Sequence, residues 1–418
     1  MGARLFTPNF ILLWLGSATS CLGNGVGLIA TMWWVQSSTG SALAMGSLAL
    51  LKTLVALFTA PWAGVMVDRI SRKRVIVFTD VIRGVVYLFF AYQAGLGKLT
   101  LSMLYAGAAI NSICAQLFSP AIGASLPLLV ASERVQSANA LRRITEQASS
   151  ALSYGLGGMM MAWLGVPMLF LIDGCSFLLS AVWESFIEIP SVGNSGKLSP
   201  ESALADLQAG LAFARSDRTL SGLLSVVALV GICFVPFSLL LPMLVQDYLG
   251  AGSEVYGYIT SAQSVGMVLG TLFILMTADT SRITWLIQWG IGIQATTLGM
   301  TAFLHVQTWG LHLIIYGVFG FLSSIINFTF ISALQRRVPQ QHLGKTLSLV
   351  NAINLGAQPL VSAISGFLAD QAGLPAVFVG AAILGVLGNI RMLRIPGAIN
   401  YLSPGEQDRG IGLSAAVR

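Results

Sequence analysis

The side chains of this chain that could carry chemistry are ionisable groups set inside long apolar stretches. Asp80 and Asp173 are the acidic ones, and Lys52 lies near the middle of its apolar run. A charge at the centre of a membrane helix costs about 2.5–3.5 kcal/mol on insertion scales, so each group needs a reason to be there. A carboxyl group in such a place can bind and release a proton. Asp173 could therefore line a polar cavity, pair with a neighbour or titrate.

Each of these groups also has a plainer interpretation. Asp173 could act as a structural hydrogen-bond acceptor. Asp80 is three residues from Arg83, a spacing typical of an intrahelical ion pair. Lys52 could line a polar cavity, pair with a neighbour or titrate. Glu146 and Glu184 lie close enough to the ends of their apolar runs to have structural roles.

The apolar stretches predict helices that cross a membrane. Of the 418 residues, 55% are hydrophobic and only 9% are charged, whereas soluble domains carry about 25% charged residues. Runs of roughly 20 apolar residues predict spanning helices. The fold class is therefore an all-α membrane protein, with twelve transmembrane helices predicted at 9–35, 43–67, 75–94, 100–127, 143–164, 167–189, 220–246, 255–278, 283–304, 308–334, 346–369 and 375–395.

Basic residues assign the loops to the two sides of the membrane. The loops after odd-numbered spans hold only Lys98, whereas the other side holds many basic residues, including the cluster at 69–74. Cytoplasmic loops carry the excess of Lys and Arg. We therefore predict a multi-pass protein of the cell (inner) membrane with cytoplasmic N and C termini. These loops also explain the net charge of +6, so no nucleic-acid partner is expected.

A long loop and an internal repeat divide the chain into halves. The loop at 190–219 opens with a flexible Pro-Ser-Val-Gly-Asn-Ser-Gly run and continues as a predicted amphipathic helix. The segment 165–170 matches 373–378 at a shift of 208 residues. We predict two parallel six-helix bundles at 1–189 and 220–395, joined by the linker at 190–219, with a tail at 396–418.

Polar uncharged residues within the spans predict a substrate cavity. Spans 1, 4, 7, 10 and 11 would line it in a two-bundle arrangement. Each polar residue alone more often joins helices than contacts a ligand. As a set they suit a mostly apolar cavity with a few polar groups. With Lys52, the cavity candidates are Asn24, Asn111, Gln116, Gln263, Asn327, Asn354 and Gln358.

The sequence shows no motif for an enzyme or an ATP-driven motor. Gly344-Lys345-Thr346 resembles the end of a phosphate loop, but Pro339 stands where that loop needs a glycine. The histidines are scattered, and the cysteines fall inside apolar runs without metal or disulfide spacing. We expect a non-enzymatic protein with no cofactor and no metal.

The segment 64–74 combines a glycine, an acidic residue and a basic cluster between two spans. Gly64 allows close helix approach, and Asp68 lies at the cytoplasmic end of span 2. Span 11 begins on the same side, and a carboxylate docked at a helix N-terminus is stabilised by roughly 0.3–2 kcal/mol. We predict a conformational gate here. A plain positive-inside loop is the alternative, which explains the basic residues but not Asp68.

The same segment resembles the signature of the major facilitator superfamily, Gly-x-x-x-Asp-Arg-x-Gly-Arg-Lys/Arg. Ser71 replaces the second glycine, and the matching residues, our gate candidates, are Gly64, Asp68, Arg69, Arg72 and Lys73. Three further stretches resemble the macrolide-efflux and siderophore-exporter branch: Asp173-Gly-Cys-Ser-Phe, Ile189-Pro-Ser-Val-Gly-Asn and Gly366-Phe-Leu-Ala-Asp370. The resemblance covers nearly the full chain.

The resemblance implies a monomeric secondary transporter that exports hydrophobic or amphipathic small molecules, macrolide-like drugs among them, by proton antiport and alternating access. For such antiport, the proton-coupling candidates are Asp173 and Asp80. Two positions depart from many drug–proton antiporters. Asn111 lies near the place of their span 4 arginine, and Ser153-Tyr154 precedes Gly157-Gly158 where they often carry a Gly-Pro pair. The alternatives are a dedicated exporter of a siderophore or other secondary metabolite, a lysophospholipid transporter, and a transport-deficient sensor or scaffold.

Overall fold

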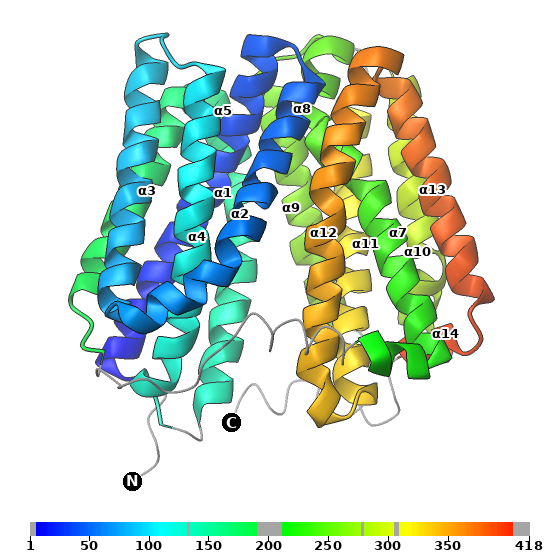
Figure 1. Ribbon diagram of the computed structural model, residues 1–418. Coiled ribbons are helices and arrows are strands. Elements are labelled where there is room, and N and C mark those ends of the chain that lie inside the picture. Colours follow the sequence, from blue (N-terminus) through cyan, green and yellow to red (C-terminus); the bar gives the residue numbers. More distant parts are fainter. Residues whose placement is uncertain (1–5, 132–133, 190–210, 277–279, 305–308, 404–418) are drawn as a thin grey trace. The chain divides into compact units, whose positions relative to one another are not determined.

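The computed structural model describes residues 6–131, 134–189, 211–276, 280–304 and 309–403. Within these ranges every regular element is a helix (Figure 1). The chain divides into two compact units: residues 1–40 with 48–200, and residues 41–47 with 201–418. The first unit contains α1 (Pro8–Thr39), most of α2 (Ala42–Arg69), α3 (Arg72–Gly95), α4 (Leu101–Leu129) and α5 (Val135–Ser185).

The second unit contains the remaining helices. They are α7 (Arg218–Leu239), α8 (Leu241–Met243), η2 (Leu244–Tyr248), α9 (Ser253–Met276), α10 (Thr280–Met300), η3 (Thr301–Phe303), α11 (Trp309–Arg337), α12 (Gln340–Ala372), α13 (Leu374–Arg394) and α14 (Ala398–Leu402). Residues 211–216 are also helical. The rest of the predicted amphipathic helix, including Leu204 and Leu207, lies outside the described residues.

The long helices have the character of membrane spans. Nine stretches within the described residues are long and apolar enough to cross a bilayer. Within the described residues, each of the twelve predicted spans overlaps a helix, with two of them in α5 and the seventh extended through α8 and η2. Large apolar side chains also face outward; Trp62, Trp163 and Met276 are 69%, 74% and 81% exposed. Such a surface is suited to lipid, in which helices satisfy their own backbone hydrogen bonds.

Side-chain caps explain where several helices begin. The Thr7 hydroxyl accepts a hydrogen bond from the Phe10 amide at 3.2 Å, and Pro8 occupies the first turn of α1. The Asp217 carboxylate accepts the amides of Thr219 and Leu220 at 2.9 and 3.1 Å at the start of α7. These oxygens satisfy N–H groups that have no partner within the helix.

Glycines break the chain at equivalent places in the two units. Gly165, inside α5, has φ 71° and ψ 175°, and Gly373, between α12 and α13, has φ 83° and ψ 156°. This region is open almost only to glycine. A proline follows two residues later in both cases, and Phe170 and Phe378 are both fully buried. The shared backbone conformation agrees with the internal repeat seen in the sequence.

The start of α2 is held by a residue far away in the sequence. Residues 41–47 belong to the second unit, where the Asp370 carboxylate at the end of α12 accepts three hydrogen bonds. The Ser41 hydroxyl donates at 2.9 Å, the Ala42 amide at 2.9 Å and the Leu43 amide at 3.1 Å. The backbones also approach closely, because a Cβ added at Gly366 would lie 2.4 Å from the Ala42 carbonyl oxygen.

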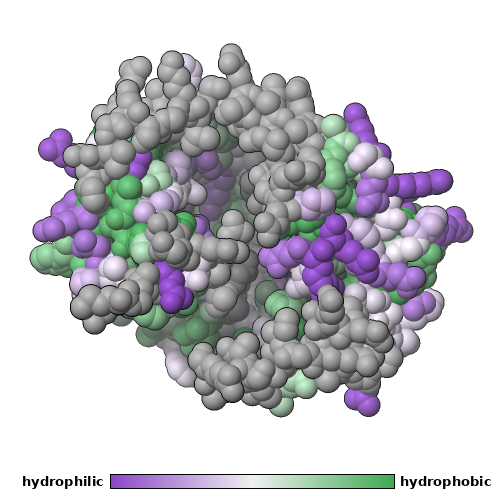
Figure 2. All heavy atoms as spheres, turned by 90° about the horizontal axis from the view of Figure 1, so that it is seen from below, coloured by the Kyte–Doolittle hydropathy of each residue, from purple (hydrophilic) through white to green (hydrophobic). Residues whose placement is uncertain are grey.

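Hydrophilic side chains gather at one end of the helices, which Figure 2 shows face-on. In the second unit, α11 ends there with Arg336 and Arg337, which donate hydrogen bonds to the carbonyls of Ser403 and Asn400 at 3.4 and 3.0 Å. Arg337 also lies 5.9 Å from the ring of Tyr401. The predicted cytoplasmic location of this end stays a prediction.

Candidate functional site

Two stripes of side chains from α3 and α5 form the chemical centre of the first unit. The α3 stripe is Asp80, Arg83 and Tyr87, and the α5 stripe is Asp173, Phe177, Ser180 and Glu184. Residues at three- and four-residue intervals share one face of a helix. The stripes meet through their aromatic rings, since Tyr87 stacks on Phe177 with centroids 5.8 Å apart at 13°. Every Asp, Glu, Lys or Arg that is fully buried in the described part of the chain belongs to these stripes.

Asp173 lies against a pair of glycines on α1. It is fully buried. A Cβ added at Gly27 would lie 1.9 Å from its Oδ2, and one added at Gly23 would lie 2.9 Å from its Oδ1. Neither oxygen has a hydrogen-bond partner among the described residues. Arg83 and the half-buried Lys52 act on the carboxylate electrostatically. The two glycines therefore make room for a carboxyl group that no donor satisfies.

Asp80 and Arg83 form a buried ion pair within α3. The Arg83 Nη1 and Asp80 Oδ1 atoms are 3.7 Å apart, and the Asp80 side chain is inaccessible to solvent. The guanidinium group also lies 4.9 Å from the Phe177 ring centroid and 5.7 Å from that of Phe118. The predicted i, i+3 pairing is thus present. At 3.7 Å it is looser than a charge-assisted hydrogen bond, so the carboxylate is only partly compensated.

Glu184 adds a third buried carboxyl group one turn beyond Ser180. It is 1% exposed and packs on Gly16 of α1, where an added Cβ would lie 3.1 Å from its Oε1. The Ser180 hydroxyl lies beside both Glu184 and Asp80 but meets hydrogen-bond geometry with neither. Sequence reasoning assigned Glu184 only a structural role. Its spacing from Asp173 and Ser180 on one helical face was the signal that could have found it.

Carboxyl groups buried with incomplete hydrogen bonding are candidates for binding a proton. An ionised carboxylate in an apolar interior is strongly disfavoured unless it is paired and hydrogen-bonded. Such clusters occur at functional sites more often than elsewhere. The two proton-coupling candidates, Asp80 and Asp173, are therefore in one cluster with Arg83. Among the described residues, no group of three or more His, Cys, Asp or Glu is placed to hold a metal ion.

The predicted cavity residues lie in varied surroundings. Asn111 on α4 donates a hydrogen bond to the Tyr87 hydroxyl at 3.3 Å and so joins the edge of the cluster. The others are not brought into this cluster by any described contact: Gln116 and Gln263 are half-buried, Asn24, Asn327 and Gln358 are exposed, and the side chain of Asn354 lies outside the described part. Their role in a substrate cavity stays a prediction.

The gate candidates are described only in part. The backbone of 64–69 is helical, but the side chains of Gly64, Asp68 and Arg69 lie outside the described part of the structure. Arg72 donates a hydrogen bond to the Ala124 carbonyl of α4 at 2.9 Å, and Lys73 is half-buried. Arg72 therefore joins the start of α3 to α4, and the gate itself stays a prediction.

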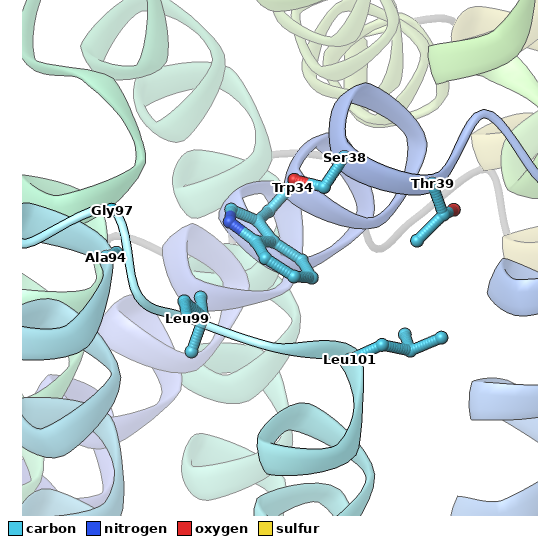
Figure 3. A pocket seen from close by; sticks show the side chains of 7 residues that line it. All are labelled: Trp34, Ser38, Thr39, Ala94, Gly97, Leu99 and Leu101. Carbon is cyan, nitrogen blue, oxygen red and sulfur yellow. The ribbon is translucent and has the colours of Figure 1, made fainter.

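A pocket of about 490 Å³ opens at the C-terminal end of α1. Figure 3 shows the Trp34 ring at its centre, with Ser38 and Thr39 from the same helix. Ala94 at the end of α3, Gly97 and Leu99 in the α3–α4 connection, and Leu101 at the start of α4 complete the lining. None of the predicted site residues lines this pocket, so it is separate from the α3–α5 cluster.

The helical fold, with its long apolar spans, is that of a membrane transporter of the major facilitator type. The chain belongs to the family described as "Transmembrane secretion effector", whose model matches residues 3–399. This confirms the family recognised in the sequence, the fold class and the expectation of a non-enzymatic transporter. It also makes the chain a multi-pass membrane protein with a small-molecule substrate.

The relatives and solved structures agree with this assignment. Macrolide efflux protein A of Streptococcus pyogenes is 23% identical over 367 residues, which cover 88% of this chain and 90% of that protein. The enterobactin exporter EntS of Shigella flexneri is 25% identical over 406 residues, covering 93% of each chain. A mutant of the nucleoside transporter NupG has a similar fold, with a TM-score of 0.72 at 14% identity, over 93% of this chain and all of that one.

Proposed function

We propose that this transporter exports hydrophobic or amphipathic small molecules, macrolide-like compounds among them, in exchange for protons. One chain acts as the transport unit. The observation that carries the proposal is the buried cluster of the first unit, in which Asp80 and Asp173 share Arg83 and lack hydrogen-bond donors among the described residues. Similarity to a macrolide efflux protein supports the direction and the class of substrate.

The cluster suggests how a proton would act on the protein. When Asp173 binds a proton, its attraction for Arg83 and Lys52 disappears, and the two cations are left to Asp80 and to any polar substrate group. When the proton leaves, the carboxylate attracts the cations again. Because these charges lie on α2, α3 and α5, protonation would change the electrostatic forces between three helices and would bias alternating access.

Transport driven by an imposed pH gradient tests the proposal. Purified full-length protein in lipid vesicles is supplied with erythromycin, and its movement is followed with and without a pH difference. A difference of one pH unit is worth about 1.4 kcal/mol per proton, or about tenfold in accumulation for one-to-one exchange. Asp173→Asn should remove this stimulation. Glu188→Gln neutralises an exposed carboxyl group just after the end of α5, and this variant should keep the stimulation by the pH gradient.

The two variants and the substrate panel separate the possible failures. Movement of no compound from a panel of macrolides and dyes would refute export of this class. Export that ignores the pH gradient in the wild-type protein would refute antiport. Wild-type gradient dependence in Asp173→Asn would remove Asp173 from the coupling step and leave Asp80 as the candidate to test.

A dedicated exporter of a siderophore or other secondary metabolite is the second candidate. The similarity to the enterobactin exporter over 93% of both chains favours it. A catecholate siderophore in the same vesicles distinguishes it, since a dedicated exporter would move that compound and leave macrolides behind. Lysophospholipid belongs in the same panel, because the sequence left that substrate open.

A further inference from the structure

Glu184 is a buried carboxyl group that the mechanism above does not use. It lies in the last turn of α5 with only 1% of its surface exposed. Neither of its oxygens has a hydrogen-bond partner among the described residues. Burying an ionised carboxylate without donors is costly, whereas the neutral acid needs much less compensation. The surroundings of Glu184 therefore favour a bound proton.

The charges that face Glu184 come from α3. Asp80 and Arg83 both act on it electrostatically, Asp80 as a like charge. The other helices against α5, α1 and α4, contain no Asp, Glu, Lys or Arg; their thiols at Cys21 and Cys114 interact with the Asp80–Arg83 pair.

Three other ionisable groups of the first unit interact elsewhere. Lys52 of α2 acts on Asp173. In the first part of α5, Arg142 pairs with Glu146. Within its own turn Glu184 has only Ser180 beside it, and on α1 it meets Gly16, which offers no side chain. No cation is thus dedicated to Glu184 among the described groups.

The numbers of acidic and basic groups around Arg83 indicate that the cluster binds one proton. The cluster has three buried carboxyl groups, Asp80, Asp173 and Glu184. Two cations act on them, the buried Arg83 and the half-buried Lys52 of α2. Fully ionised, it would carry one net negative charge, and a single proton makes it neutral. Asp80 has Arg83 at 3.7 Å, and Asp173 interacts with both cations. Glu184 is the carboxyl group left over.

We propose that Glu184 is a proton-binding site of this transporter, and that release of its proton weakens the Asp80–Arg83 ion pair. This inference rests on the proposed proton-coupled export and names a residue for it. With the proton bound, Glu184 is neutral and Arg83 stays with Asp80. When the O–H bond of Glu184 breaks and the proton leaves to water, the new carboxylate competes with Asp80 for Arg83.

The position of Glu184 suits such an exchange. It lies 11 residues beyond Asp173, about 16 Å along a helix at 1.5 Å per residue, and one residue before the end of α5. A proton leaving Glu184 therefore has a short path to the end of the helix, whereas one on Asp173 is deeper in the span. Glu184 would then exchange protons at the end of the unit, and Asp173 would do so in its middle.

Infrared spectroscopy tests the protonation directly and without a substrate. The full-length protein is purified in dodecyl maltoside, a detergent without carbonyl groups, and the C=O stretch of protonated carboxyl groups is recorded while pH is varied. Protein labelled with carbon-13 on glutamate carboxyls distinguishes a glutamic acid from an aspartic acid. We expect a protonated band at neutral pH that shifts with this label. Glu184→Gln should abolish it, and Glu188→Gln should leave it unchanged.

A second variant tests the exchange with Arg83. Asp80→Asn removes the like charge and frees Arg83, so Glu184 should ionise and its protonated band should disappear although the residue is present. The labelled wild-type protein shows whether the protonated band comes from a glutamic acid even if a variant fails to fold. A band that ignores the glutamate label, or survives in Glu184→Gln, would overturn the inference. So would an unchanged band in folded Asp80→Asn.

Transport assays keep this inference separate from the proposed function. In vesicles, Glu184→Gln should lose the stimulation of erythromycin export by a pH gradient, about tenfold per pH unit for one proton, and should keep exchange of labelled for unlabelled erythromycin. A wild-type protein that moves erythromycin without regard to pH refutes antiport, whatever the infrared band shows. Normal stimulation in Glu184→Gln refutes the role of Glu184 while antiport stands.

Discussion

Replacing Gly27 by alanine would place a methyl group against the Asp173 carboxylate. The added Cβ would lie 1.9 Å from Oδ2 and 2.8 Å from Cγ. Carbon and oxygen atoms normally approach to about 3.3 Å, so the carboxylate or α1 must move by about 1.4 Å. Overpacking of this kind costs about 1–3 kcal/mol. The same change recovers up to about 1 kcal/mol of helix propensity, which partly hides the clash.

Gly123→Ala on α4 is the matched control, since nothing lies within 4 Å of a Cβ added there. It gains the same propensity without a clash, so the two variants should differ by about 1–3 kcal/mol in free energy of unfolding. Unfolding in mixed micelles of dodecyl maltoside and dodecyl sulfate, followed by tryptophan fluorescence, measures the difference.

Combining the variant with Asp173→Ala isolates the contact. The cost of Gly27→Ala should largely vanish in that background, because the atoms that clash are gone. Equal stability of Gly27→Ala and Gly123→Ala would refute the close approach. An undiminished cost of Gly27→Ala in the absence of the carboxylate would assign it to another contact.

Three further predictions concern the backbone breaks and the helix ends. Gly165→Ala should destabilise the protein by about 1–3 kcal/mol, because its φ of 71° and ψ of 175° suit almost only glycine, whereas Gly380→Ala, in open space within α13, should not; thermal unfolding compares them. Asp370→Ala should cost about 0.5–2 kcal/mol through the lost cap on α2, and Asp370→Asn should recover part of it in the same assay. Asp68→Asn should change how fast cysteines introduced at the two ends of the helices react with an impermeant maleimide, and unchanged rates would argue against a gate at this residue.

The helices were the predictable part of the fold. Long apolar runs specify spans because the bilayer admits few other structures. The boundary expected between 164 and 167 is the Gly165 break inside α5, where local backbone chemistry decides. The transfer of residues 41–47 to the second unit was not predictable, since it depends on Asp370, more than 300 residues away.

From the sequence, the individual charged residues of the site could be predicted, but their neighbours on other helices could not. Asp80 and Asp173 stand out because each interrupts an apolar run. What surrounds them comes from other helices: Gly27 is 146 residues from Asp173 in the sequence. A single sequence gives no signal for such pairs. Glu184 was undervalued for the same reason, because proximity to a helix end suggests solvent, whereas Gly16 of α1 lets the helices close over it.

The cap that Asp370 places on α2 has a consequence for biosynthesis. The amides of Ala42 and Leu43 receive their acceptor from a residue made about 330 positions later. At roughly 5–20 residues per second, the ribosome needs about 16–65 s to reach it. Within the first turn of α2 itself, the Ser41 hydroxyl accepts the Ala44 amide at 3.2 Å. The first turn of the second transmembrane helix therefore gains these acceptors only after the eleventh helix has been synthesised.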